Sequence, residues 1–203
     1  MNQDGQPEII TAPLSAYQPL IKVFDSLGVL KSEFLAFEKT FTGGVNLAAG
    51  DLNGDGQMEI LAAAGPGRQP EVRIFNQAGK MIHSFLAYPK AFTGGLKIVS
   101  ANLFSDIRAE IVTVPQSGRL AEVKIFTSAG ESEIEWRAWA TGYTGGASVA
   151  TADTDNDGQP EIILSQASKG DSTVEIYSLS GRLTSSFKSF EDVFAGGVNL
   201  AIR

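Results

Sequence analysis

The stretch FTGGVNLAAGDLNGDGQME at residues 41–59 joins an aromatic-x-Gly-Gly turn to a short apolar segment and then to an acidic loop. The rest of the 203-residue chain repeats this stretch and its continuation. The glycine pair recurs at an unbroken spacing of 51 residues, at 43–44, 94–95, 145–146 and 196–197. A fixed period of this length that carries strand-like runs predicts a radial or stacked repeat protein rather than one irregular domain.

Aromatic residues keep the same period, and turn glycines accompany them. We expect the aromatic columns to pack in the core rather than to stack on sugars, because they recur in every period. The four columns are Phe41, Phe92, Tyr143 and Phe194; Phe24, Phe75, Phe126 and Tyr177; Phe34, Phe85, Trp136 and Phe187; and Phe37, Tyr88, Trp139 and Phe190. The turn glycines are Gly28, Gly79, Gly130 and Gly181.

Each period is expected to contain four short β-strands. In the second period the runs at 45–50, 59–65, 71–76 and 81–88 are rich in β-branched and aromatic residues and are bounded by Gly, Pro, Asn and Asp. Four-stranded units repeated head to tail predict an all-β fold, a β-propeller of four 51-residue blades forming a single domain over residues 1–203. A β-solenoid is the alternative, but its repeats are much shorter.

The two ends of the chain are complementary in the repeat. The terminal segment 196–203 lacks a hairpin partner that follows it, and the matching strand lies at residues 7–13. Pairing within one chain would close four blades, whereas pairing between two chains would close an eight-bladed ring. Bulky aromatics in the third and fourth strands suit four blades, but small alanines near the inner strands favour the eight-bladed homodimer.

Composition excludes several classes of function. The net charge is −7, which argues against nucleic-acid binding because that needs clustered Lys and Arg. No apolar run approaches the roughly 20 residues that cross a bilayer, and the start MNQDGQPEII lacks the features of a signal peptide. We therefore expect no membrane insertion. The chain has no cysteine, which excludes disulfides and cysteine-bound metals.

Two acidic loops, DLNGDGQME at 51–59 and DTDNDGQPE at 153–161, carry the pattern of a cation site. Both place side-chain oxygens at loop positions 1, 3, 5 and 9 and a glycine for the sharp turn at position 6. With the backbone carbonyl at position 7, they offer the oxygen ligands that Ca²⁺ prefers. Simple hairpin turns are the alternative. The expected ligands are Asp51, Asn53, Asp55, Gln57 and Glu59, and Asp153, Asp155, Asp157, Gln159 and Glu161.

The other two acidic loops match less well. The first keeps Asn2, Asp4, Gln6 and Glu8 but lacks the leading Asp, so we expect a weaker calcium site there. The loop at 102–110 has Phe104 at position 3 and Ile107 at position 6. We expect no calcium in that loop.

With aromatic-x-Gly-Gly, a short apolar strand and DxNxDGxxE in register, the chain resembles the FG-GAP (VCBS-type) repeats of integrin α-subunit propellers and of bacterial exported proteins. The resemblance covers the whole chain. It implies propeller blades with Ca²⁺ in the loop between the first and second strands, a mainly structural role for the metal, and an extracellular or cell-surface location. The chain departs from the family in its degenerate third loop and in having four repeats rather than the commoner seven.

The residues give little support to an enzyme. The single histidine, His83, lies in a strand-like run, and no GxSxG or Walker-type motif is present. A ligand face is expected opposite the calcium loops, at Tyr17, Arg68, Arg119 and Lys169, because varied loops on a fixed scaffold often bind. The sequence thus favours a non-enzymatic, calcium-stabilised binding or adhesion scaffold for an unidentified protein or glycan. A lectin-like module and a fragment that only self-assembles are the alternatives.

Overall fold

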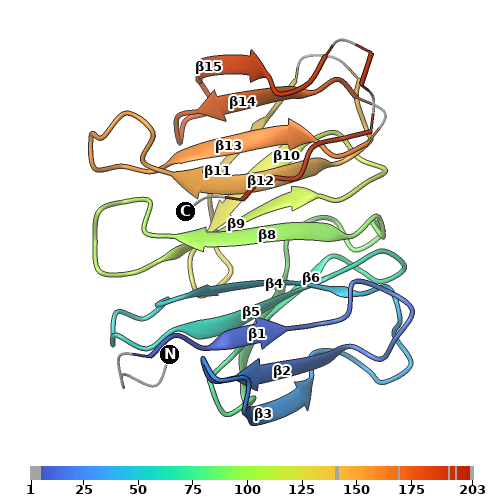
Figure 1. Ribbon diagram of the computed structural model, residues 1–203, viewed down its shortest axis with the longest axis vertical. Coiled ribbons are helices and arrows are strands. Elements are labelled where there is room, and N and C mark those ends of the chain that lie inside the picture. Colours follow the sequence, from blue (N-terminus) through green and yellow to red (C-terminus); the bar gives the residue numbers. More distant parts are fainter. Residues whose placement is uncertain (1–5, 140–141, 169, 192, 195, 202–203) are drawn as a thin grey trace.

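The computed structural model describes residues 6–139, 142–168, 170–191, 193–194 and 196–201 (Figure 1). These residues form 15 β-strands in four antiparallel sheets. Within each sheet the strands follow one another in chain order, so every connection inside a sheet is a hairpin. The all-β fold of blade-like sheets predicted from the sequence is confirmed.

The strand bounds follow the 51-residue period. The first sheet contains β1 (Ile9–Thr11), β2 (Leu20–Phe24) and β3 (Leu30–Leu35). The second contains β4 (Val45–Gly50), β5 (Glu59–Ala64), β6 (Glu71–Phe75) and β7 (Met81–Leu86). The third contains β8 (Leu96–Ala101), β9 (Glu110–Pro115), β10 (Glu122–Phe126) and β11 (Ser132–Arg137). The fourth contains β12 (Ala147–Ala152), β13 (Glu161–Gln166), β14 (Thr173–Tyr177) and β15 (Leu183–Lys188).

The second strands of the middle sheets are the most buried parts of the molecule. Every residue of β5 and β9 is buried, because a neighbouring sheet covers each face. By contrast, every residue of β15 is exposed. The core therefore lies between successive sheets, as stacking of repeat units requires.

Aromatic rings join one blade to the next. Phe34 of the first blade lies 4.9 Å from Phe75 of the second, centroid to centroid, and Phe85 lies 4.9 Å from Phe126 of the third. Trp136 repeats the contact, 4.8 Å from Tyr177. The expected packing role of these aromatic columns is confirmed at the three junctions inside the chain.

The two end sheets differ from the middle ones. They lie at opposite ends of the long axis of the molecule (Figure 1). Among the described residues, β1 pairs with β2 alone, so the first sheet has three strands. Within the described part of the terminal segment, residues 196–201, no strand pairs with 7–13 of the same chain. The described part of the terminal segment instead contacts the last blade, where the Val198 N–H donates to the Gln166 carbonyl at 3.0 Å.

Candidate metal centre

The acidic loops connect the first and second strands of the complete blades, the position that the family resemblance implies. They lie between β4 and β5, between β8 and β9, and between β12 and β13. The last strand pair before each loop is fixed in register by Gly50 with Glu59, Ala101 with Glu110, and Ala152 with Glu161. Equivalent residues of the three loops therefore start from equivalent backbone positions.

The glutamate at loop position 9 closes each described loop. Its carboxylate accepts a hydrogen bond from the backbone N–H at position 2, seven residues earlier. The three pairs are Glu59 with Leu52 at 2.9 Å, Glu110 with Leu103 at 2.8 Å, and Glu161 with Thr154 at 2.8 Å. All three glutamates are buried, with 6 to 8% of their surface exposed. Because the contact also forms in the loop at 102–110, it does not depend on the metal pattern.

In the loop at 51–59, the predicted ligands point their oxygens into the turn. The Asp51 carboxylate accepts the N–H groups of Gly54 at 2.7 Å and Gly56 at 2.8 Å. Burial raises the pKa of Asp51, but these backbone hydrogen bonds outweigh burial and hold it below its usual value. Asn53 Oδ1 accepts the Asp55 N–H at 2.8 Å, and Asp55 Oδ1 accepts the Gln57 N–H at 2.8 Å.

Negative charge accumulates in this loop. Burial raises the pKa of Glu59, and the neighbouring carboxylates of Asp55 and Asp51 raise it further. A cation between these carboxylates would reverse the last effect, because an opposite charge favours the ionised form.

The loop at 153–161 brings three carboxylates together. Oxygens of Asp153, Asp155 and Glu161 lie within 4.8 Å of one another, the one such acidic group found among the described residues. Asp153 also accepts the Gly158 N–H at 2.9 Å, and Asp157 accepts the Gln159 N–H at 2.7 Å. A carboxylate has about four lone-pair sites, so these hydrogen bonds leave room for a cation. The donor set consists of hard oxygen atoms and fits Ca²⁺.

Backbone conformation at loop position 6 distinguishes the two loops with the full ligand pattern from the loop at 102–110. Position 4 is left-handed in all three loops, with φ of 80° at Gly54, 57° at Ser105 and 60° at Asn156. Position 6 is left-handed where glycine stands, with φ of 81° at Gly56 and 91° at Gly158. The residue at position 6 of the third loop is not among the left-handed residues of the described chain. The role of position 4 was missed from the sequence, although Gly and Asn favour this conformation and only Ser105 gives no signal of it.

The loop at 102–110 keeps the turn but lacks the leading carboxylate and the side-chain oxygen at position 3. Asp106 Oδ1 accepts the Arg108 N–H at 2.6 Å, the same turn that the equivalent Asp55 makes. The side-chain amide of Asn102 donates to the Asp106 carbonyl. Phe104 and Ile107 are 39% and 73% exposed at positions 3 and 6. That this loop binds no calcium stays a prediction.

The first acidic loop is described only in part. Asn2 and Asp4 lie outside the described residues. Gln6 and Glu8 precede β1 and line a hollow of 320 Å³ beside Asp25 and Lys31.

Of the expected ligand face, Lys169 lies outside the described residues and Tyr17 is 56% exposed. The two arginines have partners within the chain. Arg68 pairs with Glu38 and Glu71, and its guanidinium lies 4.8 Å from the Phe37 ring centroid.

Arg119 repeats this arrangement in the next blade. It pairs with Glu122, and its guanidinium lies 5.5 Å from the Tyr88 ring centroid. Both arginines therefore lie over an aromatic ring of the preceding blade. The pair of Arg68 with Glu38 was missed from the sequence because the two residues are 30 positions apart and lie in different periods.

His83 also has a neighbour in the next blade. It lies in β7, and its Nε2 is 2.9 Å from the Ala129 carbonyl oxygen. Its ring is stacked beside Phe85 with centroids 6.3 Å apart. The side chain is exposed on its strand.

Residues 43–78 match the FG-GAP repeat family. A comparison with curated protein sequences found no match. Among solved structures, a protein of unknown function from Bacteroides caccae is similar with a TM-score of 0.57 and 13% identity, over 90% of this chain and 58% of that one.

Two further structures show the same likeness. The Dos1 propeller matches with a TM-score of 0.53 and 16% identity, over 85% of this chain and 43% of that one. A rhamnogalacturonan lyase from Bacillus licheniformis matches with a TM-score of 0.52 and 14% identity, over 86% of this chain and 43% of that one. The chain thus spans 43 to 58% of the length of these structures. It carries an FG-GAP repeat at residues 43–78 and has the blade fold of propeller proteins.

Proposed function

We propose that this protein is a non-enzymatic binding scaffold of propeller blades that calcium stabilises. The observation that carries the proposal is the convergence of Asp153, Asp155 and Glu161 within 4.8 Å, in a loop whose pattern recurs at 51–59. The described part of the chain contains no helix that could span a membrane. From the resemblance to FG-GAP repeats, we propose that the protein lies outside the cell or on its surface.

The calcium acts on folding rather than on chemistry. It binds the assembled loops and not the unfolded chain, so it stabilises by about 2.7 kcal/mol per site at a hundredfold excess over Kd. Two sites would then contribute about 5 kcal/mol, a large part of a typical net stability of about 5–15 kcal/mol. The cation also offsets the repulsion between clustered carboxylates that raises the pKa of Glu59.

The double variant Asp55→Ala with Asp157→Ala tests the metal. Calorimetric titration of the EDTA-treated wild type with CaCl₂ should give two strong sites, and calcium should raise the melting temperature. The double variant should lose most of both responses.

Asp106→Ala is the matched control. It removes the same side-chain-to-backbone turn at the equivalent position, since Asp106 accepts the Arg108 N–H as Asp55 accepts the Gln57 N–H. It should leave the calcium response intact. An undiminished response in the double variant would place the metal elsewhere.

The binding role has a separate test. The lyase similarity is at 14% identity and concerns the fold. We expect no release of unsaturated sugar from rhamnogalacturonan, measured by ultraviolet absorbance, and turnover above a heat-treated control would contradict the proposal. Binding of the protein to a glycan array, with a stoichiometry of one sugar per blade, would favour the lectin-like alternative.

A further inference from the structure

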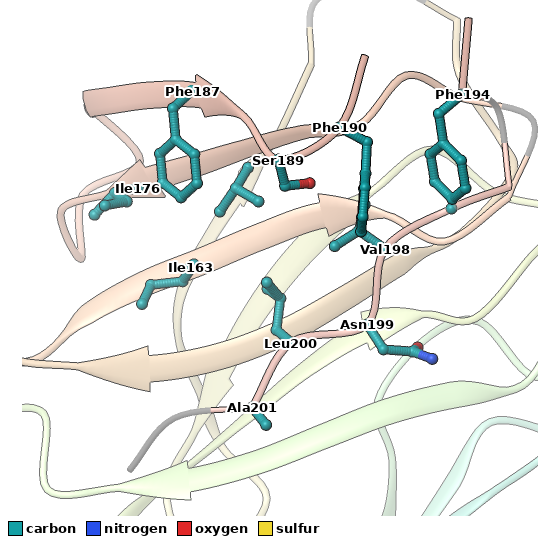
Figure 2. Close-up of a pocket in the computed structure, with 12 residues that line it drawn as sticks. Ile163, Ile176, Phe187, Ser189, Phe190, Phe194, Val198, Asn199, Leu200 and Ala201 are labelled. Carbon is teal, nitrogen blue, oxygen red and sulfur yellow. The ribbon is translucent and has the colours of Figure 1, made fainter. Parts of the chain in front are cut away.

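The outer face of the last blade carries an apolar hollow (Figure 2). It measures 550 Å³ and lies between the sheet of β13, β14 and β15 and the terminal segment. The Phe187 and Phe190 rings are directed into it and are each 53% exposed. Its walls include Ile163, Ile176, Phe187, Phe190, Val198 and Leu200.

The same side chains form a finished core elsewhere in the molecule. Three periods earlier, the equivalents of these six residues are Ile10, Val23, Phe34, Phe37, Val45 and Leu47. All six belong to the cluster at the junction of the first and second blades. There, β5 and β6 cover them with Ile60, Ala62, Ala64 and Phe75. The hollow is therefore a blade junction that lacks the residues of the covering strands.

The first blade presents those covering residues at the other end of the molecule. One period before Ile60, Ala62, Ala64 and Phe75 stand Ile9, Thr11, Pro13 and Phe24. Ile9 is 51% exposed on β1, which has no strand on its inner side among the described residues. The first blade thus offers a face of the kind that covers each junction inside the chain.

A ring-over-glycine contact makes the fit specific. At the three internal junctions, an aromatic ring packs over a turn glycine of the next blade. Its nearest atom lies 2.4 Å from the position that a Cβ would take at Gly79, and 2.5 Å from that position at Gly130 and Gly181. Around the position that a Cβ would take at Gly28, no described atom beyond the adjacent residues lies within 4 Å. Among the described glycines, none has a Cβ position that Phe187, the last ring of the series, covers. One unmatched ring and one unmatched glycine therefore remain.

We propose that the hollow binds the first blade of a second copy of this chain, with Phe187 over the partner's Gly28. The occupant is a second copy rather than the first blade of the same chain, because the two end sheets lie at opposite ends of the molecule (Figure 1). Two such head-to-tail junctions close a ring of two chains. The terminal segment then adds the missing inner strand to the partner's β1. This proposal stands independently of the metal loops.

Light scattering on the 203-residue chain measures the assembly. We expect a mass of about 43 kDa, twice that of the 21.5 kDa chain. Phe187→Glu should reduce the mass to that of one chain with an unchanged circular dichroism spectrum, because this side chain is half exposed in the single chain. Met81→Glu, at a residue 49% exposed outside the junction, is the control and should remain dimeric. A wild-type mass of one chain, or one above two chains, would overturn the proposal.

A cysteine pair distinguishes the two ways of closing. Leu47 of β4 faces Ala62 of β5, and their counterparts at the proposed junction are Leu200 and Thr11. The chain has no cysteine of its own, so Thr11→Cys with Leu200→Cys reports on this contact alone.

Oxidation should give a covalent dimer on a non-reducing gel, while each single variant should not. A monomeric band without free thiols would mean that one chain closes on itself. A monomeric band with free thiols would mean that the junction does not form. Either result contradicts the second copy.

Discussion

The loops at 51–59 and 102–110 lie on neighbouring blades between equivalent strands, but they differ in what fills the turn. Both are closed by a buried glutamate that accepts the N–H at position 2. The two loops differ at position 3, where Asn53 is replaced by Phe104, and at position 6, where the turn glycine Gly56 is replaced by Ile107. Closing the loop therefore does not require the full pattern of metal ligands, and the blade keeps its form where that pattern is incomplete.

The largest expected difference comes from removing the closing glutamate in each loop. Glu110→Ala leaves the buried Leu103 N–H without its acceptor, which costs about 1–3 kcal/mol. The cost should be the same with calcium and with EDTA. Glu59→Ala should show the same loss in EDTA and about 2.7 kcal/mol more at a hundredfold calcium excess, because a metal ligand is also lost. Urea denaturation measures both.

Equal losses for the two variants in calcium would mean that Glu59 is not a ligand. Glu59→Gln and Glu110→Gln are the matched controls. Each keeps an oxygen that can accept the N–H at position 2, so the loss in EDTA should be small.

The next effect comes from converting the third loop into a metal loop. Asn102→Asp, Phe104→Asn and Ile107→Gly reproduce positions 1, 3 and 6 of the loop at 51–59. We expect one additional calcium per chain by calorimetry and a stabilisation of about 2.7 kcal/mol at a hundredfold excess.

The variant with the first two changes alone is the control. It keeps Ile107, and the left-handed backbone found at Gly56 and Gly158 is costly for a β-branched residue. We expect weaker calcium binding in it. A folded triple variant without an extra site would show that the ligand pattern is insufficient.

The smallest effect is on pH dependence. Burial raises the pKa of Glu110 above its ordinary value of 4.5. The folded protein therefore binds this proton more readily than the unfolded chain, and stability is lost as pH rises through the raised pKa. Glu110→Gln removes this contribution. Relative to wild type, the free energy of unfolding of this variant should increase as pH rises above the ordinary value of 4.5, and a constant difference would contradict the assignment.

The sequence predicted the strands and the acidic loops because both depend on a local pattern in phase with the repeat. The expected strand at 59–65 and the observed β5, for example, differ by one residue. The closing role of Glu59 was missed because its partner is a backbone N–H seven residues away, which no side-chain pattern records. The pair of Arg68 with Glu38 was missed because it crosses between blades.

The ring-over-glycine contact also determines how the molecule should open. Each of Phe34, Phe85 and Trp136 ties the last strand of its own blade to a turn in the next, so neighbouring blades protect each other's amides. Native-state hydrogen exchange should then be slowest in β5 and β9 and fastest in β15, where such a ring stands uncovered. A substitution at Gly79 would thus be felt most strongly in the blade before the one that contains it.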